Sequence, residues 1–280
     1  MSLLARMRRP RDPKSRLRKE LAGATLPSFP GVAMQALARL RDPKASLREV
    51  GELLASDPGL SVALLRLANG AGRGALREIG SVRHAVAMLG RSEVESLVLT
   101  VGVRDALPQV PARGFDPPRF WTTAARRAAT ARAFAERLDP ARAQEHFTAG
   151  LLQDMALPVL SGWNPRKYGR LLEAWHGGDA DLAAMERETW GWCHGEVATW
   201  LCTDWGLPES LASAIGGHHH DDDCPVGVRL VSVLREGERD GADELVAMAE
   251  DRFGLEPDEA VAVLEEGARD GAALAPLFVR

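Results

Sequence analysis

Residues 57–70, DPGLSVALLRLANG, carry every signal of one short helix. Asp57 is a preferred N-cap residue, and Pro58 follows at the first helical position, where its missing N–H is not needed. Apolar residues then recur at helical spacing, and Asn69-Gly70 is a typical helix stop. Similar signals recur along the chain, with no persuasive strand and no fixed-period repeat. The sequence therefore predicts an all-α protein.

The overall composition agrees with this fold class. Hydrophobic residues make up 45% of the 280 residues, and tyrosine occurs only once. Helix-forming Ala and Leu dominate the apolar fraction, whereas sheets favour β-branched and aromatic residues. No apolar run approaches the roughly 20 residues that cross a bilayer, and the N-terminus lacks a secretory signal. The three cysteines form no CxxC pair, so neither disulfides nor a zinc knuckle is indicated. We expect a cytoplasmic protein without a membrane span.

The charge is unevenly distributed. The chain has a net charge of -4, but residues 1–20 alone carry eight Lys or Arg and two acids. Such a basic N-terminal arm is either a solvated tail or a contact for nucleic acid or an anionic membrane, and we favour the tail. The remainder, residues 21–280, is acidic. Nucleic acid is therefore an unlikely partner for the body of the protein, because phosphate contacts need clustered positive charge.

A proline-rich segment divides the helical pattern. Residues 107–118, LPQVPARGFDPP, contain four prolines and are typical of a boundary between two lobes. We expect a first lobe at about 21–106 and a second at about 119–224. Residues 225–280 then supply three more amphipathic helices as a C-terminal extension.

Eleven segments of the sequence, in order, resemble the HDOD domain family of bacterial signalling proteins. They are Leu26 to Pro30, Asp42-Pro43, Asp57 to Leu60, Leu65 to Asn69, Ile79 to Val82, Ala85 to Gly90, Phe120-Trp121, Ala149 to Asp154, Glu186 to His194, Trp205 to Pro208 and His218-His219. The resemblance covers about residues 21 to 220. It implies a two-lobed helical HDOD fold whose second lobe is similar to HD phosphohydrolases, and a role in signal transduction rather than a known reaction.

The resemblance also implies that part of a metal site is lost. Active HD phosphohydrolases hold one or two divalent metals with histidines and an adjacent His-Asp pair, and the metal activates a water molecule. Here Thr122-Thr123 stand where the first histidine is expected, and Gln153 replaces the histidine of the pair, although Asp154 is retained. Threonine and glutamine are poor ligands for transition metals. We therefore predict no catalytic residues.

Three later histidines match the family positions and leave a reduced candidate metal set. It comprises Asp154, His194 and either His218 or His219. Since two ligands are replaced, we expect this site to be vestigial, with weak divalent metal binding or none, and we predict no other cofactor.

Three functions stay open at this stage. The first is a non-catalytic regulatory module that acts on signalling proteins through protein–protein contacts, involving the groove between the lobes. The second is a degenerate metal-dependent phosphodiesterase or phosphohydrolase. The third is a sensor of a nucleotide second messenger such as cyclic-di-GMP, bound in the old active-site cavity. The missing histidines favour the first and third, and the Gly-Tyr-Pro extension of the related HD-GYP enzymes is absent after His220.

Other conspicuous residues have ordinary structural interpretations. Six of the seven tryptophans fall within residues 163–205, where we expect them to fill a core rather than stack on a base. The run at 218–223, HHHDDD, is typical of a solvated loop. His146 lies eight residues before Asp154, which alone predicts no site.

Overall fold

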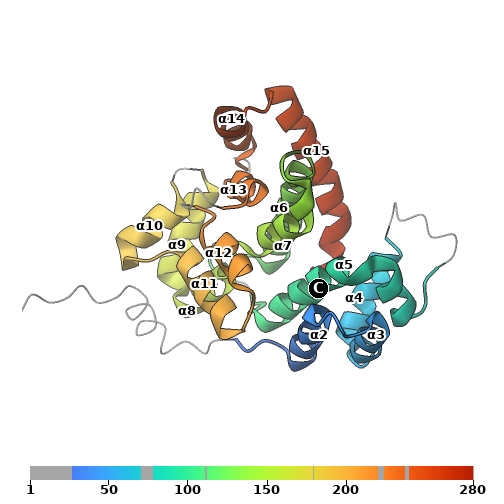
Figure 1. Cartoon of the computed structure of the whole chain (residues 1–280). Coiled ribbons are helices and arrows are strands. Elements are labelled where there is room, and N and C mark those ends of the chain that lie inside the picture. Colours follow the sequence, from blue (N-terminus) through green and yellow to red (C-terminus); the bar gives the residue numbers. More distant parts are fainter. Residues whose placement is uncertain are drawn as a thin grey trace, which may run out of the picture.

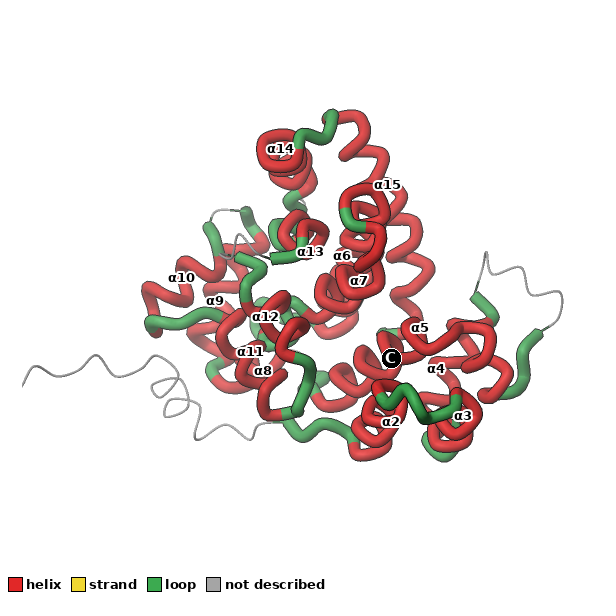
Figure 2. The backbone as a smooth tube through the Cα atoms, in the orientation of Figure 1, coloured by secondary structure: helices red, strands yellow, loops and turns green. Residues whose placement is uncertain are grey.

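The computed structural model describes residues 27–70, 78–110, 112–178, 180–219, 224–236 and 240–279. Throughout these ranges the chain forms helices joined by loops, with no strand (Figure 2), so the all-α prediction is confirmed. No helix in them is long and apolar enough to cross a membrane. The predicted basic arm, residues 1–20, lies outside the described residues, as do residues 220–223 of the His-Asp run.

The first lobe contains four helices that pack at one end of the molecule (Figure 1). They are α2 (Gly31–Arg41), α3 (Leu47–Leu54), α4 (Pro58–Ala68) and α5 (Val82–Ala106). The predicted Asp57 cap is present, since its carboxylate accepts the Leu60 N–H at 2.9 Å before α4. Ser46 and Glu49 form a capping box before α3. Helix α5 is kinked at Gly90, which has a φ of 76°.

The second lobe begins after the linker and contains most of the aromatic core. Its elements are α6 (Pro117–Leu138), the 3₁₀ turn η2 (Pro140–Arg142), α7 (Ala143–Leu152), α8 (Leu157–Trp163), α9 (Pro165–His176), α10 (Leu182–Trp190), α11 (His194–Asp204) and α12 (Glu209–Gly216). The rings of Trp190 and Trp192 stack at 5.3 Å, with Trp163 against both. Four of the six clustered tryptophans are buried and the other two are half-buried, which confirms their predicted core role.

The C-terminal extension joins the two lobes. It consists of α13 (Val226–Val231), α14 (Ala242–Phe253), α15 (Pro257–Leu274) and the 3₁₀ turn η3 (Ala275–Leu277). Helix α15 packs along α6, and the end of the chain returns to lie beside α5 (Figure 1). There Arg104 of the first lobe donates to the Leu277 carbonyl at 2.8 Å, and Phe278 lies 6.4 Å from the ring of Trp121. The extension is therefore part of the core rather than an appendage.

The close contact between α15 and α6 depends on two glycines one turn apart. A Cβ built on Gly267 would lie 2.6 Å from the Thr130 Cα, and one built on Gly271 would lie 2.6 Å from the Arg126 Cα. Backbone atoms cannot move aside as a flexible side chain can. Any larger residue at these two positions must therefore push the helices apart.

We expect Gly271→Ala to lower the free energy of unfolding by about 1–3 kcal/mol, because overpacking against backbone outweighs alanine's better helix propensity. The measurement is denaturant unfolding followed by circular dichroism. Gly162→Ala in α8 is the matched control, since its Cβ would meet nothing within 4 Å, and it should leave stability equal or higher. Equal behaviour of the two variants would contradict this account of the helix contact.

Candidate metal site

Asp154 lies buried at the junction of α7 and α8. Helix α7 ends at Leu152 and α8 begins at Leu157, so Asp154 lies in the turn between them. The carboxylate is only 3% exposed. Its Oδ2 pairs with the guanidinium of Arg127, from α6, which is itself 2% exposed. A buried carboxylate is thus compensated by a buried cation.

His194 stands at the first position of α11 and is held by Glu186 of α10. One carboxylate oxygen of Glu186 accepts both the His194 backbone N–H and its ring Nδ1–H, each at 2.7 Å. The other Glu186 oxygen accepts the Tyr168 hydroxyl. All three side chains are fully or almost fully buried. With Nδ1 committed as a donor, the Nε2 of His194 points at Asp154 Oδ1, 3.3 Å away.

His218 and His219 follow the C-terminal end of α12 and complete the cluster. The Nδ1–H of His218 donates to the Ile215 carbonyl at 2.5 Å, and its Nε2 lies 3.2 Å from the Nε2 of His194 and 3.4 Å from Asp154 Oδ1. The Nε2 of His219 lies 2.9 Å from that of His194. The solvated-loop interpretation is wrong for His218, which is fully buried, while His219 is half-buried.

The four ligand atoms have the geometry of a cation site. They lie within 4.8 Å of one another. Metal-bound histidines typically donate the second ring nitrogen to a carboxylate or carbonyl, as His194 and His218 do, which leaves both Nε2 atoms as acceptors. A tetrahedral ion bonded at about 2.0–2.1 Å separates its ligand atoms by about 3.4 Å. The four distances given above, from 2.9 to 3.4 Å, are close to this value. The residues therefore fit one divalent ion, and the structure brings all four candidate ligands together, with both His218 and His219 in the set.

The buried charges set the protonation of the cluster when no ion is bound. Burial alone would raise the pKa of the Asp154 carboxyl, but Arg127 and the two imidazoles hold that pKa well below its usual range. Burial opposes protonation of His194, yet the adjacent Glu186 and Asp154 raise its pKa well above the ordinary value. Burial lowers the pKa of His218. Without an ion, a proton on His194 thus supplies the positive charge between the ligands.

Several residues singled out in the sequence lie outside the cluster. Gln153 is fully buried, and neither atom of its amide has a partner among the described residues. Thr123 lines a small separate cavity with Arg127. His146 accepts the Gly227 N–H at 3.1 Å and contacts Asp139, which makes it a link between α7 and the C-terminal extension.

Sequence reasoning missed Arg127 and Glu186, the two charged partners of the ligands. A signal for Arg127 was present, because it follows Thr123 by four residues and so shares its helix face within an alanine-rich run. Glu186 begins one of the family-like segments, but nothing in the sequence marked it as the partner of His194. It is brought to His194 by the tight turn at Gly191, which has a φ of 80° and reverses the chain between α10 and α11.

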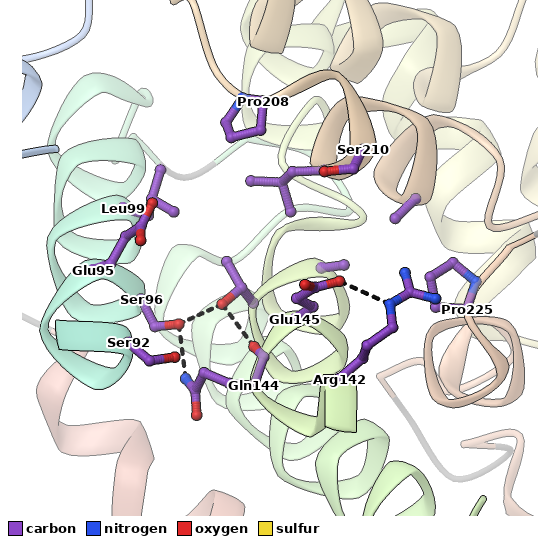
Figure 3. Close-up of a pocket in the computed structure, with 14 residues that line it drawn as sticks. Ser92, Glu95, Ser96, Leu99, Arg142, Gln144, Glu145, Pro208, Ser210 and Pro225 are labelled. Atoms are coloured by element: carbon purple, nitrogen blue, oxygen red, sulfur yellow. Dashed lines mark hydrogen bonds and ion pairs between the residues drawn. The ribbon is translucent and has the colours of Figure 1, made fainter. Parts of the chain in front are cut away.

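A groove lies between the two lobes, where the sequence analysis predicted contacts with a partner protein. This interlobe groove has a volume of about 240 Å³ and is walled by α5, α7 and α12. Figure 3 shows Gln144 donating to the Ser96 hydroxyl, at 2.7 Å, across the gap between two helices, and Arg142 paired with Glu145 nearby at 2.9 Å. Leu99, Leu211 and Ala214 give the same groove an apolar part.

Comparison with known proteins agrees with this architecture. The family model of the HDOD domain matches residues 26–221. The chain belongs to the HDOD family. A crystal structure of an HDOD domain protein from Geobacter sulfurreducens superposes with a TM-score of 0.72 at 21% identity, covering 96% of this chain and 100% of that one. A candidate phosphohydrolase from Shewanella amazonensis SB2B gives 0.71 at 23% identity, covering 93% and 98%. At such identities these HDOD-like structures establish the shared fold alone.

One curated relative also matches in sequence. An uncharacterized protein of Treponema pallidum (strain Nichols) is 22% identical over 201 residues, which is 71% of this chain. The chain spans 39% of that relative's length.

We expect Glu186→Gln to destabilise the protein in chelator by about 3–5 kcal/mol, because the His194 imidazolium loses a buried charged partner. A histidine whose pKa is raised by folding contributes its stability fully below its unfolded pKa and loses it as pH rises through the folded value. The deficit should therefore be largest in mildly acidic buffer, below the unfolded pKa of histidine, and shrink in alkaline buffer. Denaturant unfolding at both pH values measures it.

Glu188→Gln is the control for this measurement, since Glu188 lies on the same helix and is exposed. It should change stability little at either pH. A deficit in Glu186→Gln that is independent of pH would show that the carboxylate does not act through the charge of His194.

Proposed function

We propose that this HDOD domain is a non-catalytic, cytoplasmic signal-transduction module that acts through protein–protein contacts and holds one divalent ion as a structural part of its second lobe. The observation that carries the proposal is the closed set of four protein ligands. Asp154, His194, His218 and His219 come from three separate places: the α7–α8 junction, the start of α11 and the end of α12. An ion among them would fix these three elements to one another.

The closed set supports a structural rather than a catalytic ion. Structural zinc sites are four-coordinate with protein ligands only, whereas catalytic sites keep a position open for water or substrate. Here a tetrahedral ion would have all four positions filled by side chains. Among the described residues, no other His, Cys, Asp or Glu side chain joins these four to form a second ion site. Three imidazoles and one carboxylate suit Zn²⁺ best, with Fe²⁺ and Mn²⁺ as weaker candidates.

A role in signalling is supported by the family and by one neighbour in particular. A structure named as a candidate signal transduction protein from Marinobacter aquaeolei VT8 superposes with a TM-score of 0.72 at 20% identity, covering 96% of this chain and 66% of that one. The interlobe groove offers a surface for such contacts, because it combines an apolar part with hydrogen-bonding groups.

A second candidate function, hydrolysis of a phosphodiester or a nucleotide, has one observation in its favour. A cavity of about 290 Å³ lies between α9–α10 and the C-terminal extension, and His219 lines it together with Trp175 and Arg235. If His219 left the ion, a water or a phosphate oxygen would have access to the vacated position from this cavity. The same cavity would also serve a nucleotide sensor.

The purified protein should contain about one divalent ion per chain, most readily zinc, and His218→Ala should reduce this content well below one. Mass spectrometry of the metal content, before and after dialysis against a chelator, measures it. His84→Ala is the matched control, since His84 is exposed on α5 and distant in sequence from the ligands. A wild-type protein with no metal after reconstitution in zinc would refute the structural ion.

The same preparations decide between the two candidate functions. The zinc- and manganese-loaded protein should hydrolyse neither cyclic dinucleotides nor nucleoside phosphates. Turnover that disappears in Asp154→Ala would make the domain an enzyme.

Contacts through the groove can be tested with one polar substitution. Leu211→Asp places a charge among the apolar residues of the interlobe groove and should reduce capture of groove-dependent partners from the native cell by about tenfold or more. Quantitative mass spectrometry of the captured proteins is the measurement. Val62→Asp, on an exposed apolar residue of α4, is the control. Identical partners and amounts in all three preparations would remove the groove from the proposal.

A further inference from the structure

Arg127 is a permanent cation buried beside the proposed ion site. Its side chain extends from the middle of α6 and is 2% exposed. The Nε–H donates to the Leu234 carbonyl at 2.8 Å, a second nitrogen contacts the same oxygen, and the third pairs with Asp154. Arginine stays protonated under all conditions in which proteins fold. The charge therefore cannot be relieved by loss of a proton.

Asp154 is shared between this cation and the metal ligands. Its Oδ2 faces Arg127, whereas its Oδ1 faces the Nε2 atoms of His194 and His218, at 3.3 and 3.4 Å. An ion bound among the histidines would therefore receive only one oxygen from this carboxylate. It would also share the carboxylate's single negative charge with a guanidinium on the other side.

The positive charge of Arg127 and that of an ion would oppose each other at close range. Arg127 pairs with one oxygen of Asp154 and an ion would bind the other, in a part of the protein where both side chains are buried. Charges in such surroundings interact more strongly than at the surface, where water screens them. Arg127 thus stabilises the ion-free site, because it neutralises Asp154, and disfavours the loaded one.

We propose that Arg127 is a built-in competitor of the metal ion, which weakens its binding and keeps that ion exchangeable. The inference rests on the proposed function, since it presupposes that a divalent ion binds at the four ligands. It also distinguishes two roles for the arginine. A residue that merely positions Asp154 would strengthen metal binding, whereas a competing charge weakens it.

Two substitutions at the same position separate charge from packing. Arg127→Gln removes the charge but keeps a hydrogen-bond donor for the Leu234 carbonyl, and Arg127→Lys keeps the charge. Zinc affinity is measured by competition with a chromophoric chelator, and the number of ions by mass spectrometry. We expect zinc to bind Arg127→Gln about tenfold or more tightly than wild type, and Arg127→Lys within about threefold of wild type.

A second readout should move in the opposite direction. In chelator, Arg127→Gln should unfold at lower denaturant concentration than wild type, because Asp154 is left without its counter-charge. Added zinc should raise the free energy of unfolding of this variant by more than it raises that of wild type. A variant that folds only with zinc would support the inference. A variant that does not fold even with zinc would overturn it, as would weaker or unchanged zinc binding by Arg127→Gln.

The outcomes separate this inference from the proposed function. If wild type binds one zinc ion and Arg127→Gln binds it no more tightly, the inference fails and the structural ion stands. If wild type binds none while Arg127→Gln binds one, the structural ion fails in the natural protein and the competing charge stands. If neither binds zinc, both are wrong.

Discussion

The second lobe is organised around the need to compensate one buried carboxylate. Asp154 brings a negative charge into a region without solvent, and such a charge is tolerated only when opposite charge and hydrogen bonds surround it. Its two oxygens have different partners. Oδ2 pairs with Arg127, and Oδ1 lies beside the imidazoles of His194 and His218. These partners come from helices far apart in the sequence. The compensation of Asp154 thus determines how α6, α11 and the end of α12 meet.

The fold could be predicted from the sequence because its signals are local. Caps such as Ser46 and Asp57, and the break at Gly90, act within one turn of chain and require no knowledge of tertiary neighbours. The ligand residues were also identifiable, through the resemblance to a family. What the sequence did not reveal was their sum. Whether His218 or His219 belonged to the set depended on the path of the chain after α12, and the structure includes both.

Arg127 and Glu186 show a different limit of sequence reasoning. Each is a charged residue in an amphipathic helix, where the ordinary expectation is an exposed side chain. Burial of a charge becomes predictable only when its partner is known, and both partners here lie in other parts of the chain: Asp154 in the α7–α8 turn and His194 on α11. The vestigial site was inferred from the number of ligands, because Thr123 and Gln153 replace two histidines. That number did not include the cation that Arg127 adds beside Asp154, which bears on ion binding as directly as a missing ligand.

The return of the chain end to the first lobe has a mechanical consequence. Leu277 and Phe278 touch Arg104 on one lobe and Trp121 on the other, and Pro276 accepts a hydrogen bond from Arg66. Any polypeptide tethered after these residues would start at the seam between the lobes rather than at the periphery. A force applied to such a tether would reach both lobes, because the last described residues contact both. The seam is therefore the place where force or crowding from an attached domain would be felt first.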